Sequence, residues 1–190
     1  FNMENVLYPF FISCAVHEFG HFLAMKLMKV EIKSVSFECT GPVFNYCGLD
    51  VSYKKEIVIA AAGPLFGFSV SALAARIGGA TGIGELLYFG GTGAILNMFN
   101  MIPAEPFDGG RILKDFLILK KDVVSAQRIM RAVNITASIF LLAAGAYIAY
   151  ITRRNFAILA IAIWLMGRYT VCEKGKNSNY GRLAALSMLF

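Results

Sequence analysis

The amino-acid sequence predicts an all-α polytopic membrane protein with a small β-hairpin or sheet. Only 16% of the 190 residues are charged, whereas about a quarter are charged in an ordinary soluble domain. Mean hydropathy is +0.62, and apolar runs long enough to cross a bilayer recur along the chain. We expect about five transmembrane helices in this chain, and six in the full protein if one more helix precedes it.

The first predicted span, Val6 to Met28, contains the motif His17-Glu18-Phe19-Gly20-His21. Residues four apart lie on one face of a helix, so the two imidazoles can reach one zinc ion. Glu18 is close enough to accept a proton from a metal-bound water without being a ligand. The alternative is a pair of packing histidines. An ionisable residue at membrane depth costs about 3 kcal/mol, however, and usually has a function.

The stretch from Val30 to Tyr53, directly after the helix with the metal motif, predicts a hairpin or small sheet. Apolar and polar residues alternate before Gly41-Pro42, where we expect a turn, and β-prone residues resume after it. A solvent-exposed hairpin and a substrate-facing one both fit this pattern.

Two further apolar spans follow. The span from Ile57 to Ala75 contains Ala62-Gly63-Pro64, and small residues there favour close helix packing, while Pro64 predicts a kink or a restart. We expect Ile77 to Glu85 to be a glycine-rich connection. The span from Leu86 to Ile102 begins with a glycine cluster that favours helix packing over a phosphate loop, because no lysine follows it.

An irregular stretch from Asn100 to Arg111 ends the third span. It holds two prolines and two glycines within eight residues, and such a backbone is tolerated at membrane depth only if it packs in protein or lines a wet cavity. Asp108 can supply a third protein ligand to the zinc ion, leaving the fourth position to water. A surface turn at Asp108-Gly109-Gly110 is the alternative.

The remaining chain predicts no second globular domain. Arg111 to Arg131 is basic and amphipathic, which suits a membrane surface or the helix bundle. Predicted spans from Ala132 to Ile151 and from Phe156 to Tyr169 follow it. We expect a single transmembrane domain over residues 1–171 and a polar tail over residues 172–190.

The basic residues predict the orientation. Five spans place all but three of the 18 Lys and Arg residues on one side, the exceptions being Arg76, Arg153 and Arg154. The positive-inside tendency makes the first side cytoplasmic. The metal motif and Asp108 then lie near the cytoplasmic face, and the C-terminus is cytoplasmic.

Charge and cysteine usage exclude other classes. The net charge of +6 fits the membrane orientation, so no nucleic-acid partner is expected. The four cysteines form no CxxC pair, so neither a disulfide framework nor a cysteine metal cluster is predicted. Cys14 would share a helix face with His17 and His21, either as a sulfur ligand or as a small packing residue.

The two motifs together resemble the site-2 protease family of intramembrane zinc metalloproteases. HEFGH lies in a first apolar span, and Asn100-x-x-Pro103-x-x-Pro106-x-Asp108-Gly109 follows a later one. The hairpin and the Asp108-Gly109-Gly110-Arg111 ending look most like the bacterial stage IV sporulation protein FB branch. That branch usually has a helix before the metal helix and a C-terminal nucleotide-sensing domain, and neither is seen in this sequence.

This resemblance implies an activity and a site. His17, His21 and Asp108 would be the ligands of one Zn²⁺ ion, Glu18 the general base, and Asn100 and Pro106 part of a substrate-positioning loop. The enzyme would be a metalloendopeptidase of the bacterial cell membrane that cuts membrane-embedded or membrane-associated proteins. Sigma-factor precursors in sporulation are the implied substrates, and inhibitory membrane proteins are further partners. A zinc-binding transporter or a non-proteolytic scaffold is the alternative, since either could hold an ion with the same side chains.

Overall fold

The computed structural model describes residues 4–30, 32–38, 41–46 and 51–153, together with residues 160 and 163. Two compact units divide the chain, residues 1–130 and residues 131–190. The predicted fifth span and the predicted boundary at residue 172 lie outside the described residues. The candidate site is built entirely within the first unit.

Helix α1 (Glu4–Leu27) carries the HEFGH motif. Its C-terminal end is closed by two backbone hydrogen bonds, from Met28 N to Ala24 O and from Val30 N to Met25 O, both 3.0 Å long. Lys29 between them is left-handed, with φ 55°. This arrangement satisfies carbonyl groups at the helix end and turns the chain out of the helix.

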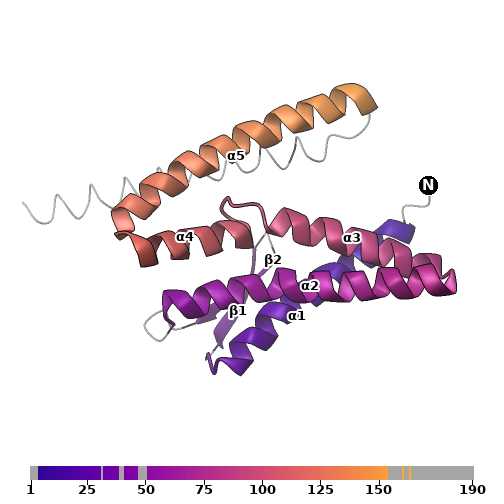
Figure 1. Cartoon of the computed structure of the whole chain (residues 1–190), viewed down its shortest axis with the longest axis horizontal. Coiled ribbons are helices and arrows are strands. Elements are labelled where there is room, and N and C mark those ends of the chain that lie inside the picture. The colour runs from indigo at the N-terminus through magenta and orange to yellow at the C-terminus, as the bar shows by residue number, and fades with distance from the viewer. Residues whose placement is uncertain are drawn as a thin grey trace, which may run out of the picture. The chain divides into compact units, whose positions relative to one another are not determined.

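Two antiparallel strands lie in the stretch for which the sequence predicts a hairpin (Figure 1). They are β1 (Ile32–Glu38) and β2 (Gly41–Tyr46). The turn predicted at Gly41-Pro42 is wrong, because both residues belong to β2 and lie opposite Glu38 and Phe37. Proline is tolerated near the start of a strand, where no ladder hydrogen bond requires its missing N–H.

Helix α2 (Tyr53–Thr81) is longer than predicted. The Ser52 hydroxyl accepts a 3.4 Å bond from Lys55 N at its start, and Gly82 caps its end in the left-handed region, with φ 74°. The helix continues through Pro64, so the restart expected there is wrong. The glycine-rich connection predicted from Ile77 is also wrong, since only residues 82 and 83 separate α2 from α3 (Gly84–Asn100).

Small residues explain the close approach of α2 and α3. A Cβ on Gly78 would lie 3.0 Å from Leu86 Cβ, and a Cβ on Gly90 would lie 2.8 Å from Ser71 O. A glycine inside a helix costs about 1 kcal/mol relative to alanine. Here the packing that it permits outweighs that preference. Gly90 therefore packs between helices as predicted.

Two more helices follow α3. They are α4 (Asp108–Lys120) and α5 (Val123–Thr152). The basic stretch predicted from Arg111 to Arg131 is thus shared between two helices. The break comes at Lys121-Asp122, where the Asp122 carboxylate accepts a 2.9 Å bond from Ser125 N and caps the start of α5.

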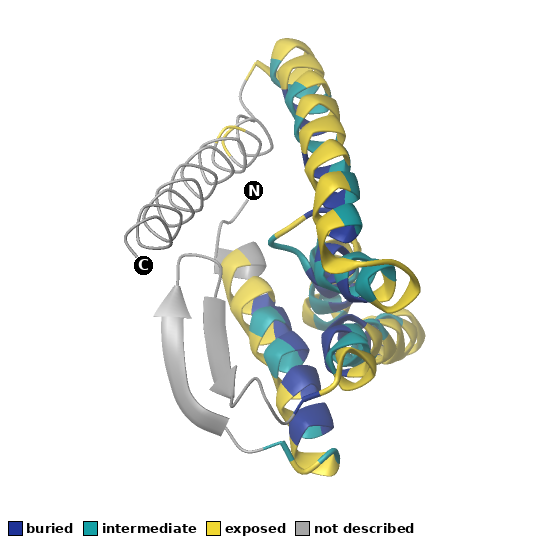
Figure 2. Ribbon diagram, turned by 90° about the vertical axis from the view of Figure 1, so that its left-hand side faces the viewer, coloured by how far each residue is buried: buried dark blue, intermediate teal, exposed yellow. Residues whose placement is uncertain are grey.

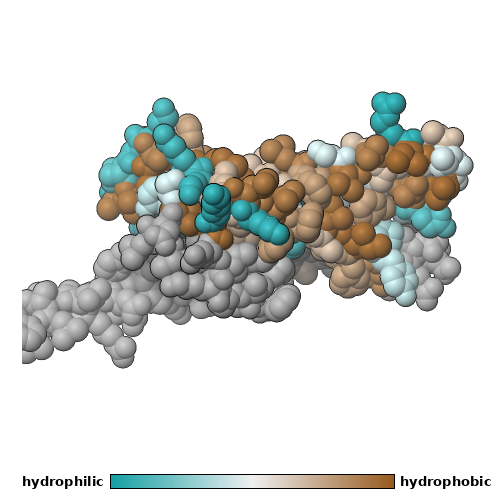
Figure 3. Space-filling model, turned by 90° about the horizontal axis from the view of Figure 1, so that it is seen from below, coloured by the Kyte–Doolittle hydropathy of each residue, from teal (hydrophilic) through white to brown (hydrophobic). Residues whose placement is uncertain are grey.

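The first unit buries polar as well as apolar side chains, and many large apolar side chains lie on its surface. Figure 2 shows buried residues in stripes along the helices, with exposed residues over the rest, and the face seen in Figure 3 is mostly hydrophobic. By length and composition, α2 and α5 are able to cross a membrane. The large apolar side chains with more than half of their surface exposed include Phe11, Leu65, Leu73, Ile95 and Met98, while the buried polar ones include Ser13, His17, His21, Ser71 and Asn97.

A small apolar core fixes the start of α2 against the end of α1. Met25 and Ile59 are almost fully buried and form one cluster with Ala24 and Val51. This packing places the Ile59 carbonyl oxygen beside the metal motif.

Candidate metal centre

The two histidines of α1 lie one turn apart and point to the same place. His17 and His21 are 4% and 6% exposed, and their Nε2 atoms are 3.2 Å apart. The rings meet edge to face, at an interplanar angle of 85°. Helical spacing alone therefore places the two nitrogens in the arrangement that the sequence predicts.

Asp108, the first residue of α4, completes the group. Its Oδ2 atom lies 3.1 Å from His17 Nε2 and 3.2 Å from His21 Nε2. Among the described residues, these three side chains form the group whose ligand atoms lie within 4.8 Å of one another. Cys14 is half-buried and outside this group, so the sulfur ligand considered from sequence is not supported.

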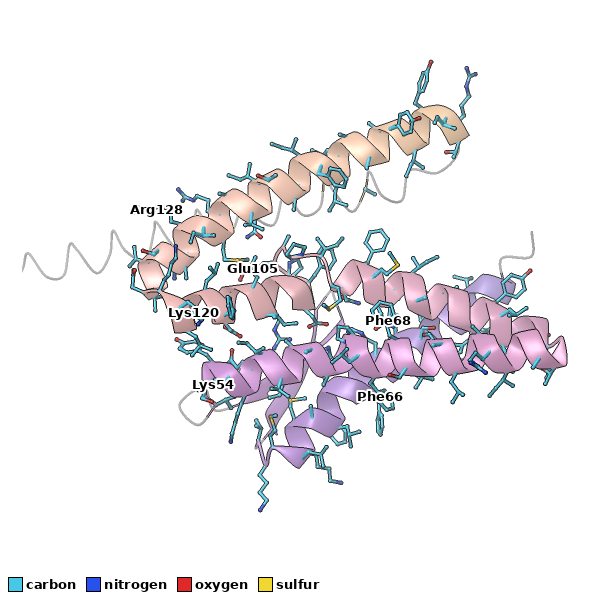
Figure 4. The ribbon with its side chains drawn as sticks, viewed as in Figure 1. Lys54, Phe66, Phe68, Glu105, Lys120 and Arg128 are labelled. Atoms are coloured by element: carbon cyan, nitrogen blue, oxygen red, sulfur yellow. The ribbon has the colours of Figure 1, made fainter. Side chains whose placement is uncertain are left out.

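Two glycines allow the carboxylate to reach the histidines. A Cβ on Gly109 would overlap the Met101 carbonyl, and one on Gly110 would overlap the backbone of Ala104. The first turn of α4 thus rests directly on the preceding loop. A salt bridge of 2.8 Å from Lys114 to Glu105, which is labelled in Figure 4, also ties that loop to α4.

The geometry fits a zinc ion. Three ligand atoms form a triangle with edges of 3.1–3.2 Å. Tetrahedral zinc with bonds of about 2.0–2.1 Å separates its ligands by roughly 3.3 Å and favours this nitrogen and oxygen donor set. His17, His21 and Asp108 therefore form a zinc-type site, as predicted, with a fourth direction left for water or substrate.

Each ligand is held by a further group. His21 Nδ1 is 2.8 Å from the Ile59 carbonyl oxygen, and His17 Nδ1 is 2.8 Å from Asn97 Oδ1 on α3. The guanidinium nitrogen Nη1 of Arg111 donates a 3.4 Å hydrogen bond to Asp108 Oδ1. Such outer contacts orient metal ligands and are usually worth 10–100-fold in metal affinity.

Electrostatics keep Asp108 ionised. Burial of this carboxyl acts to raise its pKa, but its polar contacts with the imidazoles of His17 and His21 lower the pKa by more. The pKa of Asp108 is held well below its ordinary value as a result. An oxygen ligand to zinc has to be ionised, and the lowered pKa favours that form.

The other predicted site residues lie close to this group in the chain. Glu18 is half-buried on α1 and interacts electrostatically with both histidines. Asn100 ends α3, half-buried, with Nδ2 3.2 Å from Leu96 O. Pro106 is half-buried in the loop two residues before Asp108. Their predicted catalytic and substrate-binding roles remain proposals.

Sequence reasoning predicted close helix packing around Gly63 but not the parts that four residues play at this site. Asn97 and the Ile59 carbonyl hold the histidines, and Gly63 and Gly67 make room for them: a Cβ on Gly63 would overlap the His21 ring, and one on Gly67 would overlap the Asn97 amide. A signal for Asn97 was present, because it is a polar residue inside an apolar span. A backbone carbonyl leaves no such signal.

Comparison with known proteins agrees with this site. No family model matches the chain. Over 141 residues, 70% of the chain, it is 33% identical to a zinc metalloprotease of Methanocaldococcus jannaschii, covering 39% of that protein. Over 113 residues, 55% of the chain, it is 29% identical to Rip3 of Mycobacterium tuberculosis, covering 29% of that protein. The chain thus spans well under half the length of the curated relatives that it matches.

The fold is also shared with a solved structure. A site-2 protease from Methanocaldococcus jannaschii superposes with a TM-score of 0.64 and 23% sequence identity, covering 85% of this chain and 74% of that chain. Two helices of this fold, α2 and α5, are long and apolar enough to cross a membrane. The chain is therefore similar in sequence to zinc metalloproteases and similar in fold to a site-2 protease.

Proposed function

We propose that this chain forms the catalytic part of an intramembrane zinc metalloendopeptidase that hydrolyses peptide bonds of membrane-embedded or membrane-associated proteins. One observation carries the proposal: His17 Nε2, His21 Nε2 and Asp108 Oδ2 converge within 3.1–3.2 Å of one another from two helices. Two neutral nitrogens and one carboxylate leave a bound zinc ion with net positive charge. A site with three protein ligands and this charge suits hydrolysis, whereas a closed structural site has four protein ligands.

The side chains divide the chemistry. A bound zinc ion supplies a Lewis acid and lowers the pKa of its water toward neutrality. Glu18, beside both histidines, takes a proton from the attacking water and returns it to the leaving amine as the carbon–nitrogen bond breaks. Asp108 and the two histidines would hold the zinc ion.

Substrate must reach this site in an extended form. A transmembrane helix hides its carbonyl groups in its own hydrogen bonds, so a segment has to unwind before it can be cut. Strands β1 and β2 pair with each other, and an outer edge of this two-stranded sheet can pair with an unwound segment. Asn100 and Pro106, before Asp108 in the chain, are the residues that we propose position it.

We also propose a finer biological setting, for which the sequence provides the support. The distribution of basic residues supports a cytoplasmic location for the site and the C-terminus. The Asp108-Gly109-Gly110-Arg111 ending supports the sporulation branch, with sigma-factor precursors as substrates and inhibitory membrane proteins as regulators. Lipid is the remaining partner, since large apolar side chains cover much of the surface.

The decisive experiment is the substitution Glu18→Gln, with zinc content and cleavage of a membrane protein substrate both measured. We expect zinc to be retained and cleavage to fall by at least 100-fold, because positioned proton transfer contributes about 10²–10⁴-fold. Glu85→Gln is the matched control, since Glu85 is an exposed carboxylate in the first turn of α3. Unchanged cleavage by Glu18→Gln would show that Glu18 is not the base. Zinc binding without cleavage in any variant would favour a transporter or a scaffold.

A further inference from the structure

Asn97 is the most completely buried polar side chain next to the metal centre. It lies on α3, is 0% exposed, and touches two groups through its amide. Oδ1 is 2.8 Å from His17 Nδ1, and Nδ2 donates a 2.7 Å hydrogen bond to the carbonyl oxygen of Gly93, one turn earlier on the same helix.

These contacts allow only one orientation of the amide. Gly93 O is purely an acceptor, so the NH₂ group of Asn97 must face it, and Oδ1 must face the imidazole. The opposite orientation would bring two oxygen atoms together at hydrogen-bond distance. Since Oδ1 can only accept, His17 Nδ1 must carry a proton, and in the neutral imidazole the lone pair is then on Nε2.

Helix α2 holds the amide in this place from the other side. Gly67 presents bare backbone to Asn97, and a Cβ there would overlap Oδ1 and Nδ2. Asn97 is therefore confined between Gly67 on α2 and His17 on α1. A side chain without an acceptor could fill this space but could not hold the imidazole.

We propose that Asn97 is a positioning residue that locks His17 in its Nδ1–H tautomer and presents Nε2 to the metal. His21 needs no such side chain, because its Nδ1 faces the Ile59 carbonyl oxygen, which enforces the same tautomer. One ligand is set by backbone and the other by a side chain, so Asn97 is the point at which mutation can change the tautomer of a ligand. This role rests on the proposed zinc site but not on cleavage.

The test uses Asn97→Leu and Asn97→Asp in the full chain, with zinc affinity measured by competition against a chelator. Leucine keeps the size of the side chain but removes the acceptor, and we expect its zinc affinity to fall 10–100-fold. Protonated aspartate keeps both contacts, because one oxygen accepts from Nδ1–H and the hydroxyl donates to the Gly93 carbonyl oxygen, so its zinc affinity should stay within a few-fold of wild type. Because the chain has two histidines, ¹⁵N spectra of the zinc-free protein report each tautomer directly. The His17 Nδ1–H tautomer should persist with aspartate, whereas leucine should let the Nε2–H tautomer appear beside it.

Thr92→Val is the matched control on the same helix. The Thr92 hydroxyl bonds to the Tyr88 carbonyl at 2.8 Å, so this change also removes a polar group bonded one turn back, but away from His17. We expect wild-type zinc affinity from it. Wild-type affinity and an intact Nδ1–H signal in Asn97→Leu would overturn the proposal, as would an equal loss in the leucine and aspartate variants. If the proposed protease function were wrong instead, the wild-type chain would cleave no substrate, while the zinc affinities and Nδ1–H signals of the variants would still follow these expectations.

Discussion

Gly63 on α2 lies directly against the imidazole of His21, and a Cβ at this position would overlap the ring. The ring cannot move freely, because its Nδ1 is bonded to the Ile59 carbonyl oxygen. We therefore expect Gly63→Ala to weaken zinc binding at least tenfold by displacing Nε2. Overpacking of a well-packed interior also costs about 1–3 kcal/mol. Zinc titration and denaturant unfolding of the same samples measure both effects.

Gly79→Ala provides the control for this substitution. Gly79 lies on the same helix, and a Cβ there meets nothing within 4 Å. Alanine in a helix interior is favoured over glycine by about 1 kcal/mol, so zinc affinity should be unchanged and stability equal or higher. If both alanine variants bound zinc like wild type, the close approach of α2 to His21 would not matter for the site.

At the level of single residues, the sequence predicts the three zinc ligands but not the groups that hold them in place. His17 and His21 were predictable because helical spacing fixes their relative position. Asp108 was predictable because carboxylate chemistry and topology both direct it to the same membrane face. Asn97 shares no motif with them, and its role depends on how α3 packs against α1, which side-chain spacing within one helix cannot reveal.

Between elements, the contact of α2 with α4 contains a pair of carboxyl groups. Asp115 on α4 is buried and shares a hydrogen bond with Glu56 in the first turn of α2. Burial, the charge of Glu56 and this bond together raise the pKa of Asp115 to about 6, while Lys114 and Arg111 act in the opposite direction. The pair holds a proton more tightly when the protein is folded.

This shift predicts a pH-dependent cost. A carboxyl whose folded pKa is raised binds more protons when folded, so it lowers stability as pH rises from about 4 to about 6. Asp115→Asn should remove that cost. Its free energy of unfolding should match wild type near pH 4 and exceed it by on the order of 1 kcal/mol above pH 6, allowing for solvent screening.

Denaturant unfolding in detergent between pH 4 and pH 8 measures the difference. Glu85→Gln, which removes an exposed carboxylate, should follow wild type throughout. A pH-independent difference for Asp115→Asn would contradict a shared proton between α2 and α4.

The elements themselves were predicted less well at their ends than at their centres. The segment Ile77–Thr81 contains two glycines and was predicted as a connection, but it is helical, because Gly78 packs against the start of α3. Pro64 likewise does not interrupt α2. Intrinsic preferences favour breaks at these residues, and tertiary packing, which the sequence pattern does not contain, decides otherwise.

For the whole first unit, the metal centre joins segments that are far apart in the chain. His17 and His21 come from α1, and Asp108 begins α4 some ninety residues later, with α2 and α3 between them. Helix α2 packs against α1, α3 and α4. A metal ion held by all three ligands therefore cross-links the first and last helices of this arrangement, whereas apolar packing alone is weak between helices surrounded by lipid.

Zinc should consequently stabilise the whole unit and not only its site. At a free zinc concentration of 100 times the dissociation constant, ligand linkage adds about 2.7 kcal/mol to unfolding, provided that the unfolded chain does not bind. We expect thermal unfolding in detergent to shift upward with zinc, and protection from proteolysis to rise in α1 and α4 together. Asp108→Ala should abolish both responses, because two histidines on one helix cannot connect α1 to α4. Asp122→Asn, which alters an exposed aspartate before α5 and retains its ability to cap that helix, should keep both. A zinc response that survives in Asp108→Ala, or protection confined to α1, would mean that the ion is held by the histidines alone and does not join the two helices.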